Sequence, residues 1–268
     1  MMKFMLVSLF ALSPVLGAPL PTTLSEKSSS KPPFFVLAGD STTAKQTSGG
    51  GGWGDGFLNT TLFNGASGRN YGHNGATTVG FRAGGDWSEV LNTVRSVKAD
   101  YSPFVTIQFG HNDQKPTANI SLDEYTKNLE DFVAEASDAG ATPILVTPLS
   151  RRNYENSTGK PAIIQSLSNE TKATITAARR SDAIYINLNK RSTDYLNAIG
   201  PEKAYTYNLN ADDGTHLNIG GSIVFGGIVA ELIGIYRPEL KGQGFIHVDE
   251  ELESDIGKGI YYWPRGIN

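Results

Sequence analysis

A serine follows the first apolar run of the chain. The run 34–38 ends in Gly39-Asp40-Ser41-Thr42, so the Ser41 hydroxyl would lie at the end of a strand. A serine hydroxyl becomes a nucleophile when a neighbouring base takes its proton. Glycine, aspartate, serine and threonine are also common in turns and at helix starts, so this stretch alone does not predict catalysis.

A base and a carboxylate occur together near the end of the chain, in NADDGTHLN (210–218). Asp213 and His216 are three residues apart. At that spacing the carboxylate can accept a hydrogen bond from Nδ1–H of the histidine and leave Nε2 free as a base. Asp212 is an alternative carboxylate. A capped helix start with an incidental histidine would have the same residues, so this stretch also needs a partner.

Two further stretches offer hydrogen-bond donors. Asn112 follows an apolar run in FGHNDQKP (109–116), and Gly75 lies in the loop sequence NYGHNGATT (70–78). Either residue could simply belong to a turn. With the backbone N–H of Ser41, however, the Gly75 N–H and the Asn112 side chain would supply three donors to an oxyanion. Nucleophile, base, orienting acid and oxyanion hole are then all available in one chain.

The order of these blocks resembles the SGNH (GDSL-like) hydrolase family, over residues 39–216. The resemblance implies that Ser41, His216 and Asp213 are the catalytic residues, and that Ser41, Gly75 and Asn112 form the oxyanion hole. It also implies a flavodoxin-like three-layer α/β/α sandwich with a central, mainly parallel sheet and no metal. The chain contains no G-x-S-x-G, so the nucleophile elbow of α/β-hydrolases is excluded.

Within that family, the chain is most similar to fungal rhamnogalacturonan acetylesterases. The similarity rests on FVLAGDSTTA (35–44), VTIQFGHND (105–113), ATPILVTPLSRR (141–152) and DGTHLN (213–218). It implies that an acetylated plant cell-wall polysaccharide is the substrate and that acetyl groups are removed from the pectin backbone. The alternatives are an esterase for another polymer such as xylan, a GDSL-type lipase or lysophospholipase, and a polysaccharide-binding protein without catalysis.

Pectin carries carboxylates and sugar faces, which suggests further candidates for substrate contact. Arg82, Arg151 and Arg152 could bind carboxylates, and Trp53 and Trp87 could stack on sugars. Surface charge and core packing are the simpler interpretations of these five residues, so they are not assigned to the site.

The elements that must position these residues alternate between strand and helix patterns. Apolar runs at 34–39, 103–110, 142–148 and 183–188 have the character of buried strands. Between them, 121–140 has a capping box at its start and apolar residues at helical spacing, and 220–236 is a largely apolar final helix. This alternation predicts a parallel sheet with helices on both faces. Ligands bind at the carboxyl ends of such strands, where Ser41 and residues 110–113 would meet.

The N-terminus has the layout of a secretory signal peptide. Lys3 precedes an apolar stretch, and small residues follow at Gly17 and Ala18. Ser13-Pro14 interrupts that stretch, which disfavours a membrane anchor. We therefore expect a signal peptide at 1–17, a flexible segment rich in proline and serine at 18–33, one catalytic domain at 34–268, and a secreted, extracellular protein. Four Asn-X-Ser/Thr sequons are candidate glycosylation sites, at Asn59, Asn119, Asn156 and Asn169.

The composition limits which kinds of partner and cofactor we expect. The formal net charge is −4 with no basic block, which argues against nucleic acid as a partner. There is no cysteine, so disulfides and zinc–thiolate sites are excluded. The four histidines form no H-x-x-x-H or H-E-x-x-H motif, and we expect neither a metal nor another cofactor. A monomer is expected.

Overall fold

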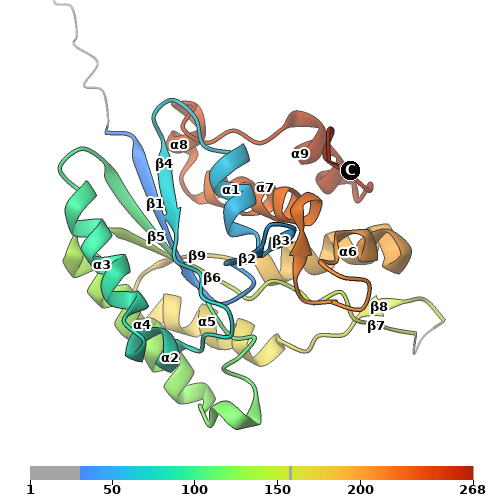
Figure 1. The fold of residues 1–268 in the computed structure, drawn as a ribbon, viewed down its shortest axis with the longest axis horizontal. Coiled ribbons are helices and arrows are strands. Elements are labelled where there is room, and N and C mark those ends of the chain that lie inside the picture. Colours follow the sequence, from blue (N-terminus) through green and yellow to red (C-terminus); the bar gives the residue numbers. More distant parts are fainter. Residues whose placement is uncertain (1–30, 157–158, 268) are drawn as a thin grey trace, which may run out of the picture. The chain divides into compact units, whose positions relative to one another are not determined.

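The computed structural model describes residues 31–156 and 159–267, and residues from Lys31 onward form one compact unit. The expected signal peptide 1–17 and most of the segment 18–33 lie outside the described residues. The first strand begins at Pro33, next to the expected start of the catalytic domain at Phe34. Figure 1 shows the arrangement of the elements.

A five-stranded sheet forms the centre of this unit, with every neighbouring pair of strands parallel. Its order is β4 (Ser67–Asn70), β1 (Pro33–Gly39), β5 (Ser102–Gln108), β6 (Thr142–Val146) and β9 (Ile184–Ile186). The four strands expected from apolar runs are confirmed. The edge strand β4 was not expected, because its sequence SGRN carries no apolar pattern.

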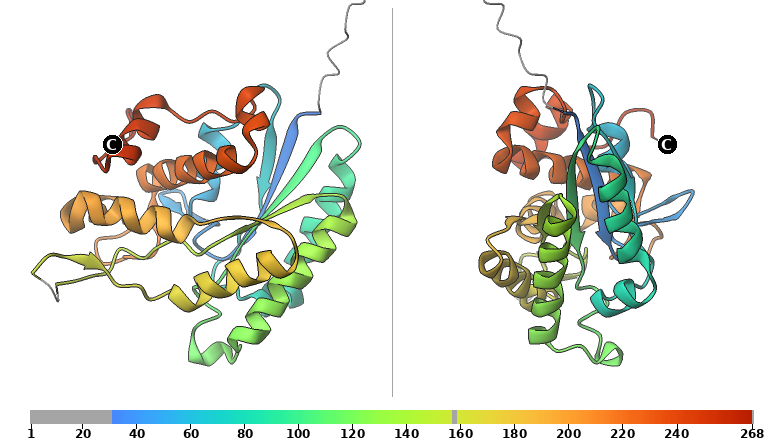
Figure 2. Two further views of the ribbon diagram at one scale, coloured as in Figure 1. Left: turned by 180° about the vertical axis from the view of Figure 1, so that it is seen from behind. Right: turned by 90° about the vertical axis from the view of Figure 1, so that its left-hand side faces the viewer.

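Helices cover both faces of the sheet, because the side chains of each strand alternate between two cores. Val36, Val105 and Leu145 face one core, which contains residues of α3 (Asp86–Val97), α4 (Leu122–Ala139) and α5 (Ser168–Arg180). Phe35, Ile144 and Ile186 face the other, with α1 (Gly54–Thr60), α6 (Leu188–Ala204), α7 (Ile219–Tyr236) and α9 (Glu250–Lys258). In Figures 1 and 2 the strands run between α3 and α4 on one side and α1 and α7 on the other. The expected three-layer α/β/α class is confirmed.

The predicted helices begin and end where their capping residues are. Ser121 accepts a hydrogen bond from Glu124 N–H at the start of α4, and the helix stops before Gly140. Asn218 caps α7 by accepting from Gly221 N–H. By length and hydropathy α7 could cross a membrane, but 61% of it is buried in this fold. It is the core helix that the sequence predicted, packed against α1.

Shorter elements complete the fold. The strands β2 (Lys45–Thr47), β3 (Gly50–Gly51) and β10 (Leu217–Asn218) form a small antiparallel sheet, and β7 (Tyr154–Glu155) pairs with β8 (Ala162–Ile163). The remaining helical turns are α2 (Thr78–Ala83), η1 (Pro116–Ala118), η2 (Tyr205–Tyr207) and α8 (Pro238–Gly242).

The two tryptophans considered for sugar stacking belong to the core. Trp53 is fully buried and packs on Phe57, and Trp87 is 2% exposed and packs on Phe132. The simpler interpretation of both residues is therefore the right one, because neither ring is available to a ligand.

Candidate active site

The structure brings together three side chains that are far apart in the sequence. His216 Nε2 lies 2.9 Å from Ser41 Oγ, and His216 Nδ1 lies 2.8 Å from Asp213 Oδ2. Ser41 follows β1 in a turn that is closed by hydrogen bonds from Thr43 N–H and Ala44 N–H to the Asp40 carbonyl. The expected nucleophile, base and orienting acid thus form one continuous hydrogen-bonded chain.

The loop before α7 fixes the Asp213 carboxylate. One of its oxygens, Oδ1, accepts from the backbone N–H groups of Thr215 and His216 at 3.0 and 2.9 Å, which leaves Oδ2 for the histidine ring. Burial acts to raise the pKa of Asp213, but the hydrogen bonds from His216 and Thr215 bring it below its ordinary value. The alternative carboxylate, Asp212, is exposed and makes no hydrogen bond to His216 within the described residues.

Arg152 binds the backbone of the same loop, and the sequence did not reveal this contact. Its side chain is fully buried and donates to the backbone carbonyls of His216 and Asp213 at 2.6 and 3.3 Å. Its Nε donates to Asn208 Oδ1, and its own N–H donates to the Gly214 carbonyl. Burial lowers its pKa to about 10. Arg152 therefore positions the catalytic loop and is not available to substrate, contrary to the role considered for it.

Gly75 and Asn112, from two other loops, line the same pocket as Ser41. Gly75 has a φ of +79°, which favours glycine at this position. Within the described residues, neither Ser41 N–H nor Gly75 N–H has a hydrogen-bond acceptor. Asn112 Nδ2 donates to the Ala76 carbonyl at 3.0 Å, which leaves its second N–H free. Unpaired donors beside a nucleophile are what a developing oxyanion needs.

Asp113 locks the loop that carries Asn112. Its Oδ1 accepts from the Thr78 N–H and hydroxyl at 2.8 and 2.7 Å, and its Oδ2 accepts from Gly110 N–H at 3.2 Å. Burial raises its pKa. The start of α2 and the end of β5 are joined through this one carboxylate.

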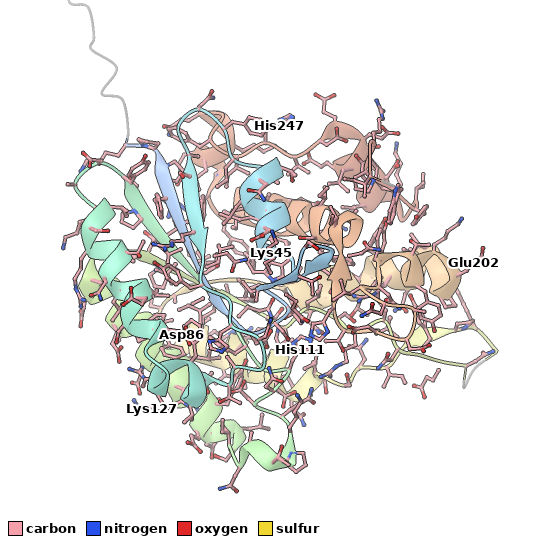
Figure 3. All side chains as sticks on the ribbon, in the orientation of Figure 1. Lys45, Asp86, His111, Lys127, Glu202 and His247 are labelled. Carbon is pink, nitrogen blue, oxygen red and sulfur yellow. The ribbon has the colours of Figure 1, made fainter. Side chains whose placement is uncertain are left out.

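A pocket of about 310 Å³ opens over these groups. Among the described residues, the lining of this pocket contains no carboxylate and no aliphatic residue. The lining residues are Ser41, Gln46, Asn74, Gly75, His111, Asn112, Lys115, Arg151, Thr215 and His216. The His111 ring, labelled in Figure 3, is buried with its Nδ1 3.6 Å from Asp40 Oδ2. Two basic side chains, Lys115 and Arg151, line this pocket.

The three candidate arginines have different surroundings. Arg151 lines the pocket, and its guanidinium donates to the Ser166 hydroxyl and the His111 carbonyl. The Gln114 side-chain oxygen also accepts from this guanidinium when the amide nitrogen donates to the Ser166 carbonyl. Arg82 lies on α2, paired with Glu135 and outside the pocket lining. Of the three, only Arg151 is placed to meet a ligand at Ser41.

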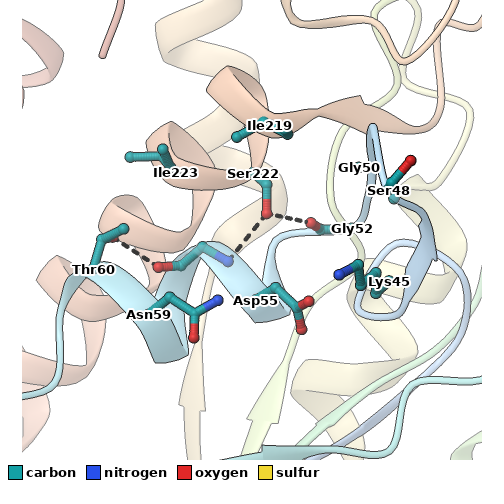
Figure 4. Close-up of a pocket in the computed structure, with 12 residues that line it drawn as sticks. Lys45, Ser48, Gly50, Gly52, Asp55, Asn59, Thr60, Ile219, Ser222 and Ile223 are labelled. Atoms are coloured by element: carbon teal, nitrogen blue, oxygen red, sulfur yellow. Dashed lines mark hydrogen bonds between the residues drawn. The ribbon is translucent and has the colours of Figure 1, made fainter. Parts of the chain in front are cut away.

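A second cavity, of about 260 Å³, lies on the other side of the β2–β3 hairpin (Figure 4). Lys45 and Asp55 line it together with Ile219 and Ile223 of α7. Gln46, at an irregularity of the pairing between Lys45 and Thr47, lines the catalytic pocket instead. The β2–β3 hairpin therefore contributes residues to both cavities.

No group of three or more histidine, aspartate or glutamate side chains that could hold a metal ion occurs in the part of the chain that the structure describes. The four sequon asparagines, Asn59, Asn119, Asn156 and Asn169, are all exposed. Their glycosylation remains a prediction.

The parallel sheet and the serine–histidine–aspartate constellation define the class of an SGNH-type hydrolase. The chain belongs to the GDSL-like Lipase/Acylhydrolase family, whose model matches residues 37–222, and is thereby a carboxylic ester hydrolase. The matched region includes all five of the expected site residues.

Similar proteins include polysaccharide acetylesterases. The chain is 29% identical over 175 residues to rhamnogalacturonan acetylesterase RhgT of Bacillus subtilis, covering 61% of this chain and 72% of RhgT. It is 29% identical over 177 residues to the uncharacterized esterase YxiM of the same organism, covering 66% of this chain and 42% of YxiM. The chain therefore spans less than half the length of YxiM.

Solved structures show the same fold. The crystal structure of YxiM has a TM-score of 0.66 at 23% identity, covering 80% of this chain and 58% of that one. Axe2, an acetylxylan esterase from Geobacillus stearothermophilus, has a TM-score of 0.52 at 18% identity, covering 76% and 93%. At these identities the likeness concerns the fold.

Proposed function

We propose that this protein is a serine esterase that removes acetyl groups from the rhamnogalacturonan backbone of pectin. The observation that carries the proposal is the hydrogen-bonded Ser41–His216–Asp213 chain at the base of a small, cationic pocket. The similarity to RhgT supports the same substrate.

The proposed chemistry is acyl transfer in two steps. Ser41 Oγ attacks the acetyl carbonyl carbon while its proton passes to His216 Nε2, and Asp213 stabilises the imidazolium. The N–H groups of Ser41, Gly75 and Asn112 hold the oxyanion. When the tetrahedral intermediate collapses, the C–O bond to the sugar breaks and the sugar oxygen takes the proton from His216. Water, deprotonated by His216, then attacks the acyl carbon of the acetyl-serine. The bond from that carbon to Ser41 Oγ breaks, Oγ takes back the proton from His216, and acetate is released.

The pocket lining favours a small polar substrate. A lipase or lysophospholipase must bury a long acyl chain, which requires aliphatic or aromatic side chains around the serine. The described lining of this pocket contains no aliphatic residue, and its aromatic rings are the polar imidazoles of His111 and His216. An acetyl group on a sugar needs only hydrogen-bond partners and a short acyl site.

Charge favours an acidic polymer over a neutral one. Lys115 and Arg151 line the pocket, and neither has a carboxylate within 4 Å among the described residues. Asp40 and Glu170 act on Arg151 only at longer range. Two cations without acidic partners, in a chain of net charge −4, suit the galacturonate carboxylates of pectin and have no counterpart in neutral xylan.

We also infer that the protein acts outside the cell. The signal-peptide pattern at residues 1–17 supports this, as does the exposure of the four sequon asparagines.

The test is acetate release from acetylated rhamnogalacturonan, acetylated xylan and a long-chain p-nitrophenyl ester. We expect the pectic polymer to be preferred, and this preference to shrink once its uronate carboxyls are reduced to alcohols. Arg151→Gln should lower kcat/KM about 10-fold on the native polymer and leave the carboxyl-reduced polymer unchanged. Arg82→Gln, outside the pocket, is the matched control.

Other outcomes would replace the proposal. Preference for xylan or for the long-chain ester would keep the triad and overturn the substrate. Binding of the polymer without acetate release would favour a non-catalytic binding protein.

A further inference from the structure

We propose that Lys115 is a positioning residue of the oxyanion hole, which orients and polarises the Asn112 amide. This inference rests on the role proposed above for Asn112. Lys115 Nζ lies 2.7 Å from Asn112 Oδ1, the end of the amide opposite to the expected donor.

The local fold brings the two residues together. After β5, the chain turns through hydrogen bonds from Gln114 N–H to the Gly110 carbonyl and from Lys115 N–H to the Asn112 carbonyl. Pro116 then starts the 3₁₀ turn η1. The Lys115 side chain thereby lies above Asn112 and lines the catalytic pocket.

Lys115 and the Ala76 carbonyl select one orientation of the amide. In that orientation Nδ2 donates to the Ala76 carbonyl at 3.0 Å, and Oδ1 accepts from the ammonium. A flipped amide would place the NH₂ group against the ammonium and the oxygen against the carbonyl, and both contacts would be repulsive. Asn112 is 6% exposed, so water cannot readily substitute for these partners.

The charge also strengthens the donor. A cation at the carbonyl oxygen draws electron density from the amide nitrogen, so the remaining Nδ2–H becomes a stronger hydrogen-bond donor. This gain is larger for an oxyanion than for the neutral ester, so the contribution should appear in kcat. Because Lys115 is itself exposed, solvent screens part of the effect.

Asn112 and Lys115 can be tested together on p-nitrophenyl acetate, a neutral ester that offers no carboxylate to Lys115. We expect Lys115→Met to lower kcat about 10-fold, with KM changed less than about 2-fold, because the donor is weakened and not removed. Lys115→Arg should restore most of the rate. Lys127→Met, on an exposed lysine paired with Asp131 on α4, is the matched control and should retain the wild-type kcat.

A double-mutant cycle distinguishes positioning from a merely structural role. In the Asn112→Ala background, Lys115→Met should have almost no further effect, because the amide through which it acts is gone. An unchanged kcat in Lys115→Met, an effect confined to KM, or the same fold-loss in both backgrounds would overturn the inference. If the wild-type protein fails to hydrolyse p-nitrophenyl acetate, the proposed function fails instead.

Discussion

At the scale of residues, the aspartate and histidine of the site have hydrogen-bond partners, whereas two of the expected oxyanion donors have none among the described residues. Asp213 and His216 are held by backbone N–H groups and by Arg152, whereas the N–H groups of Ser41 and Gly75 are unpaired within the described structure. The positions are therefore set before substrate arrives, and little reorganisation is needed during the reaction.

Asn112 gives the clearest residue-scale prediction. Asn112→Ala removes the proposed side-chain donor to the oxyanion and should cost about 2.7–4 kcal/mol of transition-state stabilisation, or about 10²–10³-fold in kcat. KM should change little. Steady-state kinetics on p-nitrophenyl acetate measures this, and a near-wild-type kcat would remove Asn112 from the oxyanion hole.

The lowered pKa of Asp213 leads to a prediction of how the stability of the fold depends on pH. Its pKa is lowered in the folded state from the ordinary 3.8, so the unfolded chain binds more protons as the pH falls through this range. The stability that Asp213 contributes is present above pH 3.8 and is lost as the pH falls through the lowered value. Thermal unfolding should therefore show a smaller acid-induced decrease in Tm for Asp213→Asn than for the wild type. Equal decreases would contradict this.

Local spacing made part of the site predictable from the sequence. Asp213 and His216 could be paired because only two residues lie between them, and Ser41 could be placed at a strand end because it follows an apolar run. Arg152 was weighed as a substrate contact or as surface charge and was not assigned to the site, because its role depends on the loop 208–216 folding over it. The hydrogen bond from Lys115 to Asn112 spans three residues, but nothing in the residue types marks it in advance.

At the scale of elements, the contact between α1 and α7 supports the catalytic loop, since α7 starts directly after His216 and β10. Gly56 on α1 lies so close to α7 that a Cβ there would be 1.9 Å from the Ser222 carbonyl oxygen. Sequence periodicity predicted α7, but it did not reveal α1 in a glycine-rich stretch. It also did not reveal β4, which is held at the sheet edge by backbone pairing with β1.

This contact yields a stability prediction. Gly56→Ala should force α1 and α7 apart and lower the free energy of unfolding by about 1–3 kcal/mol. Gly257→Ala in α9 is the matched control, because its Cβ meets no atom within 4 Å, and there we expect a gain of about 0.4–1 kcal/mol. Urea unfolding of both variants measures the difference. Equal free energies of unfolding for the two variants would show that α1 and α7 can move apart without a loss of stability.

At the scale of the whole molecule, charge is distributed unevenly. The chain carries a net charge of −4, yet the catalytic pocket carries Lys115 and Arg151 and no acidic lining residue among those described. Composition alone gave the sign of the total charge. The sequence placed residues 110–113 at the carboxyl ends of the strands, but it did not show that Lys115 and Arg151 would both line the pocket there.

This charge distribution predicts a dependence on salt. Raising ionic strength shortens the screening length from about 10 Å at 0.1 M to about 3 Å at 1 M. KM for acetylated rhamnogalacturonan should rise several-fold over that range, whereas KM for p-nitrophenyl acetate should stay constant. Equal salt dependence for both substrates would argue against recognition of carboxylates.

The most direct measurement is acetate release from acetylated rhamnogalacturonan by the wild type and by Ser41→Ala. We expect steady release by the wild type and a loss of about 10³-fold or more in Ser41→Ala, with unchanged circular dichroism and Tm. Release that persists in a folded Ser41→Ala protein would contradict the assignment of Ser41 as the nucleophile.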